Sequence, residues 1–237
     1  MMNASYHALQ ITIERRFGKK FNIKGYYTYS KTMNGAQLQG ATANGGVQNF
    51  NKLYLDCGLA DTDRRHASVT SVIWRPDYYD GHNGLIRNTI NGWMVSGVIT
   101  LQAGSPFTVT TGRDNNLDGN INDHPNVIGN PVLDPHRANR TDMWFNSSAF
   151  ASPANGTDGN ARRNLLIGPG FRNIDAGLVR TFGFRDIAHL ELRAECTNVF
   201  NIVSLGQPTA VLTSPIVGQI RTASPMRRLQ LGMRLTF

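Results

Sequence analysis

Residues 229–237 alternate strictly between apolar and polar side chains. The odd positions are Leu229, Leu231, Met233, Leu235 and Phe237, and the positions between them hold glutamine, glycine, arginine and threonine. Because successive side chains of a β-strand point to opposite faces of a sheet, this pattern predicts a strand with one apolar and one polar face. Any fold built from such strands must shield apolar side chains on one face only.

The same period of two recurs along the chain, and no helix longer than about two turns is predicted. It is clearest around Ile11, Ile23, Ile99 and Leu192, whereas the segment around Val72 is strand-like mainly through its β-branched residues. The patterns together predict an all-β protein with about seven strands of roughly ten residues each. These strands are expected in residues 6–17, 21–30, 65–74, 92–102, 173–182, 189–200 and 228–237.

The predicted connections alternate between short and long. Residues 18–20 and 183–187 are tight turns and residues 76–89 form an intermediate link, whereas residues 31–63, 104–172 and 201–227 form long polar loops. Compact soluble domains rarely carry several structureless loops of such length. Transmembrane β-barrels combine short periplasmic turns, long extracellular loops and alternating strands. The pattern therefore favours a transmembrane antiparallel barrel over a soluble β-sandwich.

Aromatic residues support the same topology, because membrane barrels carry aromatic girdles at both interfaces. In the predicted strands, one set of aromatics falls beside the short turns, which would be the periplasmic rim. The set is Phe17, Phe21, Trp74, Trp93, Phe182, Phe184 and Phe237. We predict that these residues mark the membrane interface, with outer-membrane lipid contacting the apolar face and a polar lumen on the other.

Composition excludes several classes of function. The formal net charge is +8, yet the basic residues are dispersed, so no nucleic-acid partner is expected. Charged residues make up 17% of the chain, below the roughly one quarter usual in soluble domains. No apolar run approaches the length of a membrane-spanning helix. The first ten residues lack the pattern of a signal peptide, so the chain is expected to carry none.

Several further stretches resemble TonB-dependent outer-membrane receptors, and within them the Oar-like group. They are DTDRRH (61–66), GWMVSGVITLQAGSPFTV (92–109), DNNLDGNINDHPN (114–126), WFNSSAF (144–150), RNLLIGPGFRNIDAGL (163–178), RAECTNVFN (193–201) and LQLGMRLTF (229–237). Their order and spacing over nearly the whole chain resemble the C-terminal part of such receptors.

The resemblance implies a barrel of about 22 strands with a plugged lumen. Such receptors take up nutrients with energy passed from the inner membrane through TonB, and the barrel-assembly machinery recognises the aromatic residue that ends their last strand. Phe237 matches that residue, and Leu231, Met233 and Leu235 match the alternating apolar residues before it. These four residues are the expected assembly signal.

Residues 1–237 also depart from the family pattern. The stretch shows no plug domain and no TonB box, and seven strands cannot close a barrel of this size. We therefore expect a C-terminal portion of the barrel, which contributes wall, outer loops and assembly signal to a parent protein in the bacterial outer membrane. The nutrient ligand is unknown. Two other hypotheses stay open, namely a passive porin or adhesin-type barrel and a secreted carbohydrate-binding β-sandwich.

The stretch DNNLDGNINDHP resembles a calcium-binding loop. Asp114, Asn116 and Asp118 take positions 1, 3 and 5 of an EF-hand-like loop, and Asn120 and Asn122 are further candidate ligands. Pro125 replaces the bidentate glutamate expected at position 12, so Asp123 would have to substitute. The alternative is a turn whose Asp and Asn side chains bond to their own backbone. No other cofactor is expected.

Catalysis has little support in the sequence, and the protein is not expected to be an enzyme. The six histidines are scattered, and none lies at metal-ligand spacing from another. The run Asp63-Arg64-Arg65-His66 is predicted to form a cluster of ion pairs at the rim rather than an acid/base site. Trp144, Phe145 and Phe150 could stack on a ligand, but we expect them to anchor their loop.

Overall fold

The computed structural model describes residues 3–18, 20–35, 47–49, 51–77, 79–81, 84–184 and 188–237. Seven long strands form one antiparallel sheet in the order β1-β2-β4-β5-β10-β11-β12, and the short strand β3 pairs with β2 beside this path. The long strands are β1 (Ala4–Phe17), β2 (Phe21–Asn34), β4 (His66–Trp74), β5 (Trp93–Gln102), β10 (Phe171–Phe184), β11 (Ala188–Thr197) and β12 (Arg228–Thr236). The seven predicted strands are thus confirmed, although β1, β2 and β10 are longer than predicted.

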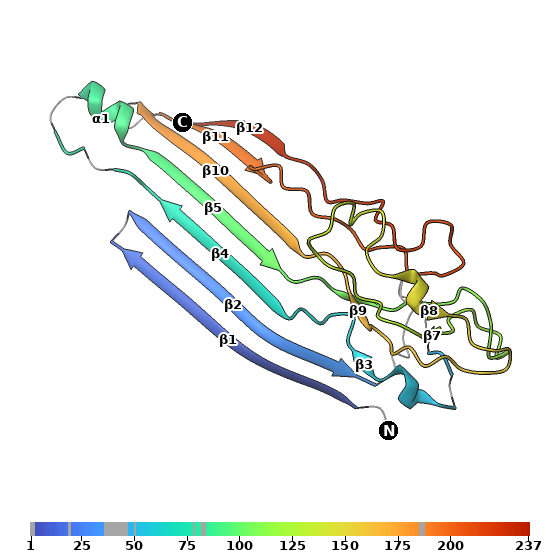
Figure 1. The fold of residues 1–237 in the computed structure, drawn as a ribbon. Helices are drawn as coiled ribbons and strands as arrows, with labels where there is room; N and C mark the ends of the chain where they lie inside the picture. The colour runs from blue at the N-terminus through green and yellow to red at the C-terminus, as the bar shows by residue number, and fades with distance from the viewer. Residues whose placement is uncertain are drawn as a thin grey trace.

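The strands follow one another like a meander, so that short and long connections lie at opposite ends of the sheet (Figure 1). At the short-turn end, Phe17 pairs with Phe21 across the β1–β2 turn, in which Gly18 has a φ of +58°. This left-handed conformation is one that glycine adopts without steric cost. The long connections all leave from the opposite end, which we call the outer end.

The β4–β5 connection at the short-turn end contains the only α-helix in the described part of the chain, α1 (Gly84–Ile90). Asn91 follows this helix and holds the connection together, because its side-chain amide bonds both the N–H and the carbonyl of Tyr79. No helix within the described ranges is long and apolar enough to span a membrane.

The long loops are not structureless, which corrects the sequence-based expectation for residues 31–63, 104–172 and 201–227. They contain two 3-10 helices, η1 (Leu53–Asp56) and η2 (Ser147–Ala149). They also contain the two-residue strands β3 (Gly58–Leu59), β6 (Pro106–Phe107), β7 (Asn126–Val127), β8 (Phe150–Ala151) and β9 (Leu166–Ile167). Strand β6 pairs with β9, and β7 pairs with β8.

These loops pack into one body at the outer end of the sheet, which we call the outer-loop unit (described residues of 47–65, 103–170 and 198–227; Figure 1). Its core is centred on Phe145, whose ring lies 5.8 Å from that of Phe107 and 5.9 Å, edge on, from that of Phe150. Val109, Ala149, Ala161 and Leu166 complete the buried cluster. Because residues of both the second and third long loops pack against this cluster, the loops support each other.

Candidate functional site

The register of the sheet places apolar side chains from all seven strands on one face. Residues paired across antiparallel strands lie on the same face. Ile11 pairs with Tyr27, Thr70 with Ile99 and Ile99 with Ile174, and the same face continues through Leu192 to Met233. The side chains of Leu9, Ile11, Leu192 and Leu231 are 58%, 45%, 40% and 73% exposed. These side chains therefore lie in no protein core, as a lipid-facing surface requires.

Arginines on this apolar face lie only near its ends. Arg15 lies close to the short turn, with its guanidinium 4.4 Å from the centre of the Phe17 ring. Arg180 lies over the Trp93 ring at 5.3 Å and the Phe182 ring at 4.6 Å. Arg172 pairs with Leu101 at the outer end. Because a charge is least costly near a membrane interface, this placement fits a face that contacts lipid.

The opposite face carries the mid-strand charges of the sheet. Glu14 pairs with Lys24 across β1 and β2, and their charged atoms are 3.5 Å apart. On β11, the Arg193 Nε lies 2.5 Å from a carboxylate oxygen of Glu191. The other charged residues of this face, placed by register, are Arg16, Asp175, Glu195, Arg228 and Arg234. One face of the sheet is thus apolar in its middle and the other is polar, as predicted.

The predicted interface aromatics lie at the short-turn end of the sheet. Phe21 pairs with both Phe17 and Trp74, and Trp93 begins the next strand at the same end. Phe182 pairs with Leu190, Phe184 ends β10, and Phe237 follows β12 with 95% of its side chain exposed. Their contact with a membrane interface stays a prediction.

Strand β12 is an edge of the sheet and carries the predicted assembly signal. It pairs with β11 alone, and Leu231, Met233 and Leu235 are exposed on the apolar face. The row of apolar side chains that the sequence predicts is therefore accessible to another protein or to lipid. Recognition by an assembly factor stays a prediction.

The Asp/Asn loop around residue 118 uses its side chains to bond its own backbone. The Asp114 carboxylate accepts the N–H groups of Asp118 (3.1 Å) and Gly119 (3.0 Å), and the Asp118 carboxylate accepts the N–H of Asn120 (2.9 Å). Asn122 is partly buried, and its side chain forms no hydrogen bond with another described residue. This is the geometry of the alternative interpretation, a self-bonded turn.

Asp123 lies at the base of this loop. One of its carboxylate oxygens accepts the N–H groups of Asn115 and Asn116. Burial raises the pKa of Asp123, and the nearby carboxylates of Asp114 and Asp118 raise it further. Among the described residues, no three histidine, cysteine or acidic side chains gather closely enough to hold a metal ion. Calcium binding therefore remains a prediction. Backbone carbonyl and asparagine side-chain oxygens would have to supply ligands for the ion.

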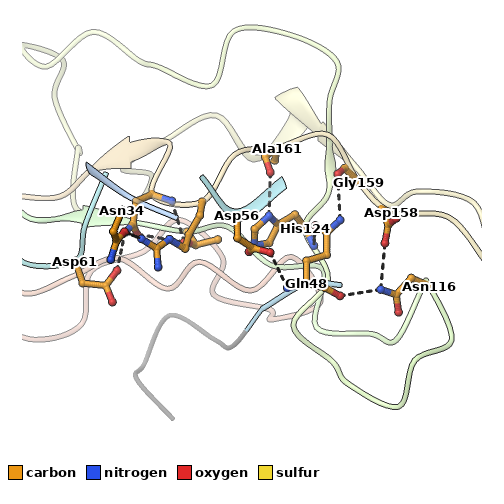
Figure 2. Close-up of polar contacts among 12 residues, drawn as sticks. Asn34, Gln48, Asp56, Asp61, Asn116, His124, Asp158, Gly159 and Ala161 are labelled. Atoms are coloured by element: carbon orange, nitrogen blue, oxygen red, sulfur yellow. Dashed lines mark hydrogen bonds and ion pairs between the residues drawn. The ribbon is translucent and has the colours of Figure 1, made fainter. Parts of the chain in front are cut away.

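A buried polar network joins the first long loop to the second (Figure 2). Its centre is Gln48, which is fully buried: its Nε2 donates to the Gly159 carbonyl (3.3 Å), and its Oε1 accepts the N–H of His124 (3.0 Å). The Gln48 N–H donates to the Asp56 carboxylate (3.1 Å). A side chain at position 159 would overlap the carbonyl oxygen of His124, so only glycine permits this approach.

Asp56 and His124 form an almost completely buried pair in this network. The His124 Nε2 lies 3.7 Å from a carboxylate oxygen of Asp56, and its Nδ1 lies 2.9 Å from the Ala161 carbonyl, to which it can donate a proton. Burial lowers the pKa of His124 and raises that of Asp56, and in each case the partner opposes the shift. The pair therefore favours its uncharged forms, which suits a structural contact between loops.

Asp158 holds the solvent-facing side of the network. Its carboxylate accepts bonds from Lys52 (2.7 Å), Asn49 (3.0 Å) and Asn116 (3.2 Å). Burial opposes ionisation of Asp158, but these hydrogen bonds outweigh it and lower its pKa to about 2. Asn116, one of the predicted calcium ligands, is thus engaged as a hydrogen-bond donor that joins two loops.

Arg163 and Asn164 fasten the second loop to the outer end of the sheet, and we call these two residues the loop clasp. The Arg163 guanidinium donates to the Asn34 side chain and to the Leu59 carbonyl. The Asn164 amide donates to the same carbonyl (2.7 Å) and to the Asp61 carboxylate (2.6 Å).

The predicted ion-pair cluster of residues 63–66 is wrong for the described residues. The Asp63 carboxylate accepts the N–H of Thr32 (2.6 Å), and Arg64 donates to the carbonyls of Asp61 and Asp63. Both aspartates therefore bond to neutral donors, and the segment serves as a connector between β2, the loops and β4.

The predicted anchoring role of the loop aromatics is confirmed. Phe145 is 1% and Phe150 7% exposed, and the Trp144 indole N–H donates to the Ile167 carbonyl (2.8 Å). In contrast, sequence reasoning missed Gln48, Asp56, His124 and the loop clasp as partners. Most of their contacts join different segments of the chain, such as Gln48 with His124 (76 positions apart) and Arg163 with Asn34 (129 positions apart), so no local spacing could reveal them.

Comparison with known proteins agrees with this geometry. No match to this chain was found among curated proteins. The model of one protein family, the outer membrane beta barrel domain, matches residues 1–230. Because this match covers nearly the whole chain, the chain belongs to the outer membrane beta barrel domain family, and its place is the outer membrane.

Proposed function

We propose that this protein is the C-terminal barrel portion of a TonB-dependent outer-membrane receptor that takes up a nutrient. The observation that carries the proposal is the combination of a two-faced sheet with a folded outer-loop unit at one end of it. The sheet supplies part of a lipid-facing wall. The outer-loop unit supplies a structured surface on the extracellular side, where a nutrient would first be captured.

The open sheet supports a larger barrel. Strand β1 pairs only with β2, and β12 only with β11, so both edges present backbone groups that no other described strand satisfies. Each unsatisfied backbone group in hydrocarbon costs several kcal/mol, and closed barrels avoid this cost. Further strands must therefore complete the wall. The count of about 22 strands, the plug and the coupling to TonB rest on the resemblance described above.

The proposed function involves no catalysis. Its partners are outer-membrane lipid, the TonB system, the barrel-assembly machinery and a nutrient ligand. It needs no cofactor, with Ca²⁺ in the loop of residues 114–122 as the one candidate. Calorimetric titration of Ca²⁺ into the full-length protein, with an Asp118→Asn variant as control, tests that candidate. Heat that saturates in the parent and vanishes in the variant supports a calcium site.

A swelling assay separates the proposed receptor from a passive porin. The full-length protein is reconstituted in liposomes that are then placed in isotonic arabinose. A plugged receptor leaves the liposomes unswollen, whereas an open porin admits the sugar and swells them. A plugged barrel that transports nothing would also leave the liposomes unswollen, so site-specific crosslinking to TonB in living cells provides the second measurement. Swelling, or absence of the crosslink, contradicts the proposal.

The single-layer sheet argues against the secreted β-sandwich. In a sandwich, a second sheet covers the apolar face of the first. Here the described residues place no second sheet over the apolar face, and side chains such as Leu231 and Met233 are about three-quarters exposed. The adhesin and porin alternatives share the barrel and differ from the proposal in the plug and in TonB coupling.

A further inference from the structure

An apolar pocket with an arginine in its lining lies in the outer-loop unit. Its volume is about 260 Å³, and nine of its eleven lining residues are apolar. Phe145 and Leu166 form part of the wall and are buried in the core, while Val132 is 64% exposed. The Trp144 ring is fixed by the bond from its indole N–H to the Ile167 carbonyl. Such a rigid apolar wall favours an apolar ligand body.

The two other lining residues are Arg137 and Arg140, and none of the lining residues is acidic. Arg137 Nη1 donates to the Asp134 carbonyl (2.7 Å), but its Nη2 is shielded from solvent and has no hydrogen-bond partner among the described residues. One oxygen of the Asp134 carboxylate accepts the N–H of His136 (2.8 Å), and among the described residues this carboxylate forms no ion pair with Arg137. Neither Arg137 nor Arg140 forms an ion pair with a described acidic residue, so two positive charges at the pocket are left for a bound anion to balance.

We propose that this pocket binds a small amphipathic carboxylate, with its apolar body against Trp144 and Leu166 and its carboxylate on Arg137. A carboxylate matches the planar donor geometry of a guanidinium. A dry cavity of about 150 Å³ holds benzene. The pocket volume of about 260 Å³ therefore leaves room for one ring and a short acid chain. A cargo role for this ligand rests on the proposed function, whereas binding to the pocket does not.

The test uses the full-length protein in detergent micelles and two matched probes, 3-phenylpropanoate and its uncharged amide. Calorimetry is expected to show saturable binding of one acid per protein and at least about tenfold weaker binding of the amide, because a charge-assisted hydrogen bond is lost. Arg137→Gln should remove this preference. The matched control Arg113→Gln changes an exposed arginine in another part of the same loop and should keep it.

A second variant guards against misfolding of Arg137→Gln. Val132→Trp places a large ring at an exposed position of the lining and should block both probes while the protein stays folded. Equal affinity for acid and amide, an unchanged preference in Arg137→Gln, or no binding of either probe at millimolar concentration overturns the inference. Arabinose swelling together with preferential acid binding would instead overturn the transport proposal and leave the pocket intact.

Discussion

The assignment of the two faces can be tested on neighbouring residues of strand β5. Ile99 lies on the apolar face, between Thr70 and Ile174, whereas Thr100 lies on the polar face, between Val69 and Asn173. We consider the two substitutions Ile99→Arg and Thr100→Arg, which introduce the same charge at nearly the same depth. Only the face differs between them.

The depth of Ile99 sets the expected cost. Ile99 lies six residues along β5 from Trp93, which begins the strand at the aromatic rim. At about 3.4 Å per residue this is about 20 Å along the strand. With a strand tilt of about 40° the depth is about 15 Å, close to the middle of an apolar band about 25 Å tall. Arginine at this depth on the lipid face costs about 2–4 kcal/mol.

This cost corresponds to a fall in the folding equilibrium constant of about 30- to 700-fold for Ile99→Arg. Thr100→Arg should change the free energy of unfolding by no more than about 0.5 kcal/mol, because its face is already polar. The measurement is urea unfolding of the full-length protein in phosphatidylcholine vesicles, followed by tryptophan fluorescence. Equal losses in the two variants, or a larger loss in Thr100→Arg, would refute the assignment of the faces.

Three further predictions concern the C-terminus, the loop core and the buried histidine. Deletion of Phe237, which is 95% exposed, should reduce the amount of assembled barrel in the outer membrane several-fold, whereas Arg234→Gln on the polar face of the same strand should not. Heat-modifiable gel mobility measures the amount of assembled barrel, and equal amounts in the two variants would contradict the assembly signal. Phe145→Ala should destabilise the outer-loop unit by about 3–5 kcal/mol and make the loops sensitive to protease, while the gel mobility of the barrel stays unchanged. Loops that remain resistant to protease in this variant would contradict a shared core. Because burial lowers the pKa of His124, the unfolded loops take up its proton more readily than the folded ones. The folded loops therefore lose stability as the pH falls below about 6.5, and His124→Gln should lose less protease resistance than the parent protein between pH 7.5 and 5. Asp56 has a raised pKa and acts in the opposite direction, so the test compares the parent protein with the variant. The same pH dependence in both proteins would rule out His124 as the cause.

The sheet could be predicted because its information is local. Alternation around Ile11, Ile99 and Leu192 defines strand and face within a few residues, and the length of each connection then orders neighbouring strands. The boundary errors lie at strand ends: β1, β2 and β10 extend beyond the clear alternation, and β11 ends at Thr197, three residues before its predicted end.

The outer-loop unit could not be predicted in the same way. Its contacts join residues such as Gln48 and His124 or Asn34 and Arg163, which have no periodic or spaced relation in the sequence. The polar composition of these segments indicated long loops and nothing more. In the folded protein, their polar side chains form hydrogen bonds with buried polar groups of the other loops. The spacing of residues 114–122 suggested Asn116 as a calcium ligand. In the structure, the Asn116 side chain instead donates hydrogen bonds to the Gln48 carbonyl and to Asp158, and no loop motif encodes these contacts.

The loop clasp is continuous with one wall of the proposed pocket, residues 165–167, and this continuity limits how that wall can move. Arg163 and Asn164 bind the end of β2 and the Leu59 carbonyl, and the next residues, 165–167, line the pocket. Strand β9 within that segment also pairs with β6, which follows β5 closely. Closure of this wall over a ligand would have to break these bonds together. We therefore expect the described part of the outer-loop unit to act as a fixed rim, so that any movement during uptake occurs elsewhere in the parent protein. Hydrogen exchange tests this directly: the Asn164 N–H, which donates to the Thr108 hydroxyl (2.9 Å), should exchange slowly and equally with and without 3-phenylpropanoate, and faster exchange on binding would show that the rim opens.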